Sequence, residues 1–239
     1  MNKKIGFSNI GGVYIEENIQ TKTHIHQAIT VIISFKDNFD CFIEQKQISS
    51  SGIVIQPNTI RQFNSPENNS IAFIHIEPFS EQGLKLIDRD IPFTELSKSQ
   101  TENIIMFIKK WALHKGNQEK LTEELINSTI KEIKPTTNNL TIDKRIKKVI
   151  DIIQKTENTS LKSISKTVNL STFRLSHLFK QETGITLKKF VLHTKLVKSI
   201  KAIYQNQNLT QSAYSGNFAD QAHFTRTYKN SFGVLPSKL

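Results

Sequence analysis

The stretch that decides the fold is LKSISKTVNLSTFRLSHLFKQETGITLKKF at residues 161–190, and LTQSAYSGNFADQAHFTRTYKNSFGVLPSKL at residues 209–239 repeats its pattern. Each copy contains a short apolar-periodic segment, a turn residue and a second helix that ends at Gly, which is the sequence form of a helix-turn-helix. A tandem pair of such motifs can enter two successive major grooves of a duplex. The residues that recur 48 or 49 positions later, identical or similar, are Leu161, Asn169, Leu170, Phe179, Lys180 and Gly184.

The charge of the chain is concentrated in the half that holds this repeat. Residues 1–134 contain 15 Lys and Arg against 16 Asp and Glu, whereas residues 135–239 contain 17 against 5. Such an excess on its own is typical of a solvated surface, but together with a duplicated helical motif it indicates a polyanion-binding site. The second half is therefore a candidate for binding duplex DNA, and the first half is not.

Length and composition bound the class of protein. A chain of 239 residues can hold two domains, each large enough to bury its own core. It has no apolar run of the roughly 20 residues that span a membrane, and its start, MNKKIGFSNIGG, lacks the apolar stretch of a signal peptide. The single cysteine, Cys41, has no internal disulfide partner. We therefore expect a cytoplasmic protein with no membrane partner.

The first half changes its hydrophobic period once. Residues 5–79 contain short β-rich runs separated by turn residues, which predict a small antiparallel barrel or sandwich. From about Lys98 the apolar residues follow a helical period, with one stripe between Ile104 and Trp111 and another between Leu121 and Ile133. These two helices either cover the barrel or form a homodimer interface. The clearest β-rich runs are residues 28–35, 39–44, 52–56 and 70–76.

A linker separates the two halves. The sequence KPTTNN at residues 134–139 has no apolar residue, which is typical of a linker. The predicted domains are residues 1–134 and residues 141–239, joined by residues 135–140. In the second domain, one helix is predicted around Ile146 to Ile153, and a longer helix from about Thr186 to Tyr204 would connect the two copies rigidly.

The second helix of each copy has an apolar face and an opposite polar face. With successive residues 100° apart, Leu175, Leu178 and Phe179 in the first copy, and Phe224, Thr227 and Tyr228 in the second, point inward. The outer face of any surface helix is polar, yet these outward side chains are also the kinds that read grooves and hold phosphates. The candidate DNA-binding residues are Thr172, Phe173, Arg174, Ser176, His177 and Lys180 in the first copy, and Gln221, Ala222, His223, Thr225, Arg226 and Lys229 in the second.

These candidates differ in the chemistry that they offer. Arg226 can bond O6 and N7 of guanine, and Phe173 and Ala222 can contact thymine methyl groups. Lys180 and Lys229, at the ends of the two outward faces, can bind phosphates. Asn169 and Asn217 stand where the turn of each motif is expected. We predict a positive φ at both, because Asn tolerates that conformation better than most residues.

On these residues the second half resembles the DNA-binding domain of the AraC/XylS family of bacterial transcription regulators, most specifically in NFADQAHFTRTYKNSFGVLP. The sequence departs from the family pattern at a few positions: Asn217 replaces Gly, Lys195 replaces Arg, and Ser165 and Ser199 replace Ala. The resemblance implies a cupin-like β-barrel in the N-terminal half, which binds a small-molecule effector or mediates dimerisation. It also implies an activator more than a repressor, with RNA polymerase as a partner.

The front half holds the only residues that point to another class of function. His24 and His26 have the spacing that places two imidazoles on one face of a strand, as a metal site needs. Cupin enzymes add a carboxylate and a further His, but no carboxylate follows here and Arg61 lies about where the further His would be. Two ligands close no metal site, so the histidines either line an effector pocket or are ordinary histidines of the surface or the barrel mouth. Arg61 is the best candidate for an anionic effector group.

The fold class expected from the sequence is α+β: a cupin-like β-barrel with a helical hairpin, followed by an all-α domain with two helix-turn-helix motifs. The function expected is a sequence-specific, DNA-binding transcription regulator that is not an enzyme and has no catalytic residue, no metal and no cofactor. The alternatives are a cupin-type metal protein or enzyme with an accessory basic domain, and a nonspecific nucleic-acid binder.

Overall fold

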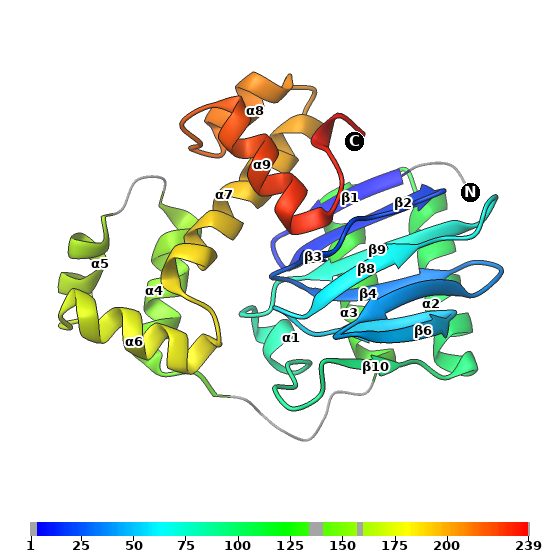
Figure 1. Cartoon of the computed structure of the whole chain (residues 1–239), viewed down its shortest axis with the longest axis horizontal. Helices are drawn as coiled ribbons and strands as arrows, with labels where there is room; N and C mark the ends of the chain where they lie inside the picture. The colour runs from blue at the N-terminus through cyan, green and yellow to red at the C-terminus, as the bar shows by residue number, and fades with distance from the viewer. Residues whose placement is uncertain (1–3, 134–140, 157–159, 239) are drawn as a thin grey trace. The chain divides into compact units, whose positions relative to one another are not determined.

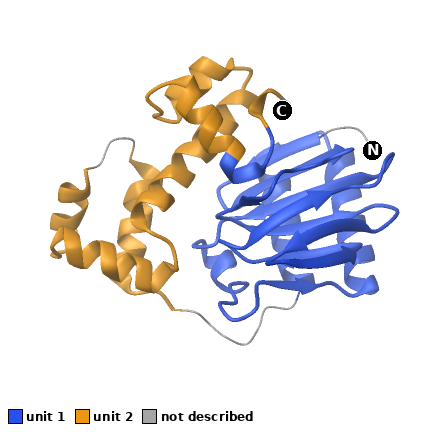
Figure 2. Ribbon diagram, viewed as in Figure 1, with its two compact units in different colours: residues 1–140, 230–234 blue, residues 141–229, 235–239 orange. Residues whose placement is uncertain are grey.

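A computed structural model describes residues 4–133, 141–156 and 160–238. These residues form two compact units, shown in Figures 1 and 2. The front unit holds the described residues up to 133 together with 230–234, and the second unit holds residues 141–229 with those from 235 onward. The predicted linker, residues 135–140, lies outside the described residues.

The front unit consists of two antiparallel sheets. The six-stranded sheet has the order β1-β2-β9-β4-β7-β10, and the four-stranded sheet has the order β3-β8-β5-β6. Their strands are β1 (Lys4–Ser8), β2 (Gly11–Glu17), β3 (His24–Ile25), β4 (Ile29–Ser34), β5 (Phe39–Ile43), β6 (Lys46–Ser50), β7 (Gly52–Ile55), β8 (Ile60–Asn64), β9 (Ser70–Ile76) and β10 (Phe93–Glu95).

The fold class expected from the sequence is confirmed, with one correction to the shape of the front unit. The four β-rich runs correspond to β4, β5, β7 and β9. The expected barrel is not closed, because the described strands form two separate sheets with β1 and β10 as free edges of the larger one. Side-chain packing between the sheets, rather than a continuous ring of backbone hydrogen bonds, therefore holds the two layers together.

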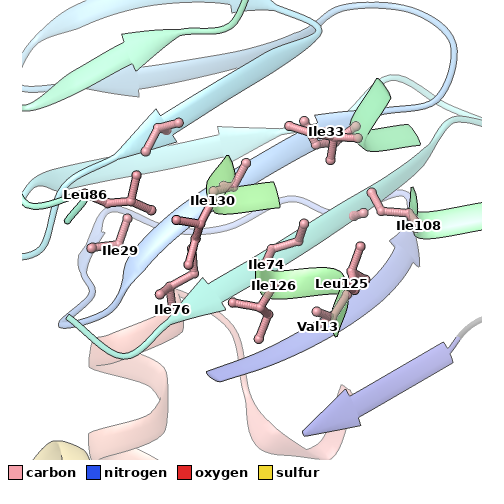
Figure 3. Close-up of a cluster of buried hydrophobic side chains, with 14 of the residues drawn as sticks. Val13, Ile29, Ile33, Ile74, Ile76, Leu86, Ile108, Leu125, Ile126 and Ile130 are labelled. Carbon is pink, nitrogen blue, oxygen red and sulfur yellow. The ribbon is translucent and has the colours of Figure 1, made fainter. Parts of the chain in front are cut away.

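Two long helices cover the outer face of the six-stranded sheet. They are α2 (Lys98–Leu113) and α3 (Gln118–Ile133), and the short helix α1 (Glu81–Leu84) precedes them. Figure 3 shows how Ile108, Leu125 and Ile130 pack against sheet residues such as Val13 and Ile74. The apolar stripes of both helices are thus buried in this core, and the expectation that one of them forms a homodimer interface is wrong for these faces.

The second unit is all helical in its described residues. A buried row on α4, from Ile146 to Ile153, and the buried Phe179, Phe190 and Phe224 supply much of its core. The helices are α4 (Lys144–Lys155), α5 (Leu161–Thr167), α6 (Thr172–Thr183), α7 (Leu187–Tyr204), α8 (Leu209–Ser215) and α9 (Gln221–Phe232), followed by a 3-10 turn, η1 (Pro236–Lys238). The long helix α7 connects the pair α5 and α6 to the pair α8 and α9 (Figure 1).

Candidate functional site

The two helix pairs of the second unit have the same turn. In the first, the backbone N–H of Leu170 donates to the carbonyl of Ser165 at 3.0 Å, and in the second the N–H of Phe218 donates to the carbonyl of Ala213 at 2.9 Å. Both bonds close the end of a seven-residue helix. The repeat seen in the sequence is therefore a repeat of backbone geometry.

The turn residues have the conformation predicted for them. Asn169 has a φ of 51° and Asn217 a φ of 62°. We call the second helix of each motif, α6 and α9, its reading helix. The residues that follow these helices, Gly184 and Gly233, also have positive φ, at 75° and 71°. Glycine reaches this left-handed region without strain and asparagine tolerates it, so these four positions fix where each helix begins and stops.

Polar caps fix the start of each reading helix. The hydroxyl of Ser171 accepts a hydrogen bond from the N–H of Arg174 at 3.1 Å, and the carboxylate of Asp220 accepts one from the N–H of His223 at 2.6 Å. A cap of this kind contributes about 1 kcal/mol to helix stability. Because the caps set the first turn, they also set which side chains of α6 and α9 face outward.

The predicted division into inner and outer faces is confirmed by burial. The side chains predicted to point inward, Leu175, Leu178 and Phe179 in α6 and Phe224, Thr227 and Tyr228 in α9, are all buried. Among the candidate DNA-binding residues, Ser176, His223 and Thr225 are half-buried and the other nine are exposed. Phe173 is 82% exposed, which is unusual for a large apolar side chain and suits a contact with a partner.

Several outward side chains already have partners on the protein. The hydroxyl of Ser176 donates to the carbonyl of Thr172 at 2.8 Å, so only its lone pairs remain for a ligand. The ring of His223 packs edge-on against Phe218, with 5.1 Å between ring centroids. Gln221 accepts a hydrogen bond from Thr210 at 2.6 Å. Helical periodicity does not predict the contact between Thr210 and Gln221, because this contact joins two helices, α8 and α9, across the turn.

The connecting helix α7 packs closely against the turn between α8 and α9. Lys195 donates from Nζ to the carbonyl of Asn217 at 2.7 Å, so the lysine that departs from the family pattern has a structural partner. A Cβ atom on Gly216 would lie 1.9 Å from Oγ of Ser199 and 2.5 Å from the carbonyl oxygen of Lys195. Glycine is therefore required at residue 216 for this approach.

A second group of polar side chains lies in the front unit, around Arg61 of β8. Its guanidinium is buried and donates to the carbonyl of Thr59, the hydroxyl of Thr30 and the carbonyl of Gln56, at 3.2, 2.9 and 2.9 Å. Burial lowers the pKa of Arg61 to about 9, which leaves the side chain charged at neutral pH. Within the described residues no carboxylate forms an ion pair with Arg61, although the charge of Glu44 favours the charged guanidinium, and the three hydrogen-bond acceptors are neutral oxygens.

The histidines expected near this site take different positions. His24, in β3, lies opposite Arg61 in the four-stranded sheet, and burial lowers its pKa to about 4, so it is neutral at pH 7. His26 follows the strand, is buried, and accepts a hydrogen bond at Nδ1 from the N–H of Ala28 at 3.0 Å. Its ring stacks on that of His75, with centroids 4.4 Å apart. The interpretation of His26 as a surface histidine is therefore wrong.

Among the described residues, no group of three or more His, Cys, Asp or Glu side chains is placed to hold a metal ion. We predict that purified protein has the same metal content as a variant with His24→Ala and His26→Ala, because two imidazoles alone close no site. Elemental analysis of both proteins checks this. Stoichiometric zinc or iron that disappears in the variant would contradict the prediction.

Comparison with known proteins places this architecture in a class. Residues 164–239 match a protein family described as "Helix-turn-helix domain". The chain thus carries a helix-turn-helix domain over these residues. In the described residues no helix is long and apolar enough to cross a membrane.

Individual relatives share one part or the whole of the chain. The chain is 30% identical over 97 residues to the Msm operon regulatory protein of Streptococcus mutans, an alignment of 39% of this chain and 34% of that protein. It is 20% identical over 237 residues to the probable transcriptional regulator LumQ of Photobacterium leiognathi, covering 94% of each. The chain thus spans about a third of the length of the first relative and nearly all of the second.

The fold of the whole chain is similar to a solved structure. This is wild-type ToxT from Vibrio cholerae, described as bound to an unsaturated fatty acid, with a TM-score of 0.61 and 12% identity. The match covers 99% of this chain and 94% of that one. At this identity the similarity concerns the fold alone, and it includes both units.

Proposed function

We propose that the protein is a sequence-specific, DNA-binding transcription regulator whose front domain responds to a small molecule. The observation that supports it most is the pair of helix-turn-helix motifs, which have the same turn geometry and each an exposed polar helix face. They lie in the half of the chain that contains 17 basic and 5 acidic residues. A relative aligned over nearly the whole chain is named a probable transcriptional regulator. A cupin-type enzyme or metal protein has no comparable support.

In this proposal the domains have separate tasks. Residues 1–134 bind the effector and mediate homodimerisation, residues 135–140 act as the linker, and residues 141–239 bind DNA. The protein acts in the cytoplasm, is not an enzyme, and activates transcription by contacting RNA polymerase beside its site. Because the apolar faces of α2 and α3 are buried, dimerisation uses another surface of the front domain.

The twelve candidate residues on α6 and α9 form the DNA-contacting surface. Arg226 is exposed near the middle of α9, between Phe224 and Tyr228, whose buried rings fix the direction of the helix face. Its planar fork can bond guanine at O6 and N7 together. Lys180 and Lys229 are exposed in the last turns of α6 and α9, where a flexible ammonium suits a phosphate.

Arg226→Ala is expected to weaken binding to the preferred site by about 1–3 kcal/mol and to relax the preference at one base pair. Lys229→Ala is the matched control, since it removes one exposed charge from the same helix and should weaken binding to all sequences alike. Both side chains are exposed, so stability should change little. Quantitative binding to the preferred and to random duplexes distinguishes the two roles. Equal loss on both duplexes for Arg226→Ala would make that residue a phosphate contact.

The effector in this proposal is an amphipathic anion, with Arg61 as its charged partner and His24 and His26 beside it. Arg61 has five N–H groups, of which three are used by neutral oxygens. Apolar side chains such as Ile55 and Phe73 are buried between the two sheets, and the hydrocarbon body of the effector is proposed to pack among them. The neighbour with a similar fold has been solved with an unsaturated fatty acid.

An unsaturated fatty acid is expected to raise the melting temperature of the wild-type protein, whereas its methyl ester, which has the same body and no charge, is not. Arg61→Met should remove the effect of the acid, because the substitution keeps an unbranched apolar side chain and deletes the guanidinium. Thermal unfolding with each compound checks this. Equal stabilisation by acid and ester, or an undiminished response in Arg61→Met, would remove Arg61 from the effector site.

A further inference from the structure

The first helices of the two helix-turn-helix motifs, α5 and α8, differ in charge. Helix α5 carries Lys162 and Lys166, whereas α8 has no charged side chain. With the 48-residue offset of the repeat, the corresponding positions of α8 are held by Thr210 and Tyr214. The reading helices α6 and α9 each carry one arginine and one lysine. The excess of basic side chains in the first motif over the second therefore lies in α5.

The two lysines of α5 lie on one side of the helix. They are four residues apart, which places them about one turn from each other on the same face, and both are exposed. A third exposed ammonium lies close by, because Nζ of Lys148 in α4 donates to the carbonyl of Thr167, the residue after Lys166, at 3.4 Å. We call Lys148, Lys162 and Lys166 the α5 lysine cluster. Within the described ranges, none of the three forms an ion pair.

The stability of α5 does not explain the whole cluster. A positive charge near the last turn of a helix is favourable, which accounts for Lys166 and for Lys148 beside Thr167. Lys162 is the second residue of α5, where the helix dipole disfavours a positive charge. The three positive charges also repel one another. A negatively charged partner would offset both costs.

The place of α5 in its motif indicates which partner this is. In a helix-turn-helix bound to DNA, the second helix enters the major groove while the first helix crosses the sugar-phosphate backbone. The turn that joins α5 to α6 is closed by the hydrogen bond from Leu170 to Ser165, as the second turn is by that from Phe218 to Ala213. When α6 enters a groove, α5 therefore lies near phosphates, and a flexible ammonium suits a phosphate oxygen.

We propose that the α5 lysine cluster binds backbone phosphates beside the half-site of the first motif, so that this motif anchors the protein on DNA by charge. The second motif, with Thr210 and Tyr214 in the same places, binds fewer phosphates and contributes mainly base contacts. This inference rests on the proposed function, since it concerns the DNA-bound protein. It adds a surface of α4 and α5 to the residues of α6 and α9.

The test measures the affinity of the 239-residue chain for a labelled duplex over a salt series. Lys162→Gln combined with Lys166→Gln removes two charges and keeps two polar side chains that favour helix. The slope of log affinity against log salt should become shallower by about 2, since each phosphate contact contributes roughly 0.9. Adding Lys148→Gln should make it shallower by about one more. The preferred and a random duplex should lose affinity by the same factor.

Three control variants separate a local contact from an effect of net charge. Lys109→Gln with Lys110→Gln removes two exposed charges from α2 of the front unit and should leave the slope unchanged. Lys162→Arg with Lys166→Arg keeps both charges and should retain the wild-type slope. Tyr214→Lys places an ammonium on α8 at the position that corresponds to Lys166, and should make the slope steeper by about one.

Three results would overturn the proposal. The first is an unchanged slope in the double Gln variant of α5. The second is an equal change in the double Gln variant of α2, which would make the effect one of net charge. The third is an altered base preference in the α5 variant, which would make its lysines base contacts. A wild-type protein that selects no sequence would instead contradict the proposed function, so the two failures are distinguishable.

Discussion

The affinity of the 239-residue chain for duplex DNA is expected to fall about a thousandfold between roughly 50 and 200 mM salt. The reason is the net positive charge of residues 135–239, which contain 17 basic and 5 acidic residues. If on the order of 6 phosphates are neutralised, the counterions they release make binding this dependent on salt. Fluorescence anisotropy with a labelled duplex, repeated over a salt series, gives the slope.

The slope also has a matched control within the protein. Lys180→Ala and Lys229→Ala should each reduce it by about one, because each variant removes one predicted phosphate contact. Replacing an exposed lysine of the front unit, such as Lys109 of α2, should leave the slope unchanged. A flat salt response of the wild-type protein would reject the electrostatic basis of the proposed interface.

Gly216→Ala is expected to destabilise the second unit by about 3 kcal/mol, at the upper end for an overpacked site. The added Cβ would meet Oγ of Ser199 at 1.9 Å and the carbonyl oxygen of Lys195 at 2.5 Å, and the second of these atoms belongs to helix backbone. Relief requires α7 and the second turn to move apart. DNA binding should weaken as well, because the same turn orients α9.

Ser199 supplies the control for this variant. Its hydroxyl is buried without a hydrogen-bond partner, so Ser199→Ala alone should stabilise the protein by about 1 kcal/mol. Combined with Gly216→Ala, it should restore part of the loss, since it removes the closest clash and leaves the one with Lys195. If Gly216→Ala unfolds like the wild type, the close packing of this turn against α7 is wrong.

The unfolding of the front unit can be followed separately by the fluorescence of a single tryptophan. Trp111, the only tryptophan of the sequence, is buried in the front unit, where Nε1 donates to the hydroxyl of Thr122 at 3.1 Å. Denaturant unfolding followed by its fluorescence reports the front unit, while far-UV circular dichroism reports the helices of both units. A shift for Gly216→Ala in the second signal with no shift in the first would assign the damage to the second unit.

The second unit could be predicted closely from the sequence because its determinants are local. Helical periodicity gave the inward sets of α6 and α9, and the positive φ of Asn169 and Asn217 follows from a property of asparagine itself. The hydrogen bonds of Thr210 to Gln221 and of Lys195 to Asn217 could not be predicted in this way. They join residues 11 and 22 positions apart, and only the packing of helices brings these residues together.

The front unit was harder to predict because its determinants are distant in the sequence. The β-rich runs indicated strands, but strand order depends on pairings such as β2 with β9, which bring Tyr14 opposite Phe73. The place of Arg61 in the sequence makes it an effector candidate, but its burial against Thr30 and Gln56 depends on how the two sheets pack. The spacing of His24 and His26 is also found in metal sites, and only the packing of the sheets shows that His26 is a buried ring stacked on His75.

The asparagines in the two turns have a practical consequence. A residue with a side chain in the left-handed region carries a conformational cost, which is lower for Asn than for most residues and absent for Gly. Asn169→Gly and Asn217→Gly would remove this cost without altering any of the twelve side chains on the reading faces. The conformational cost of each turn can thus be altered at a position separate from the twelve side chains that are proposed to contact DNA.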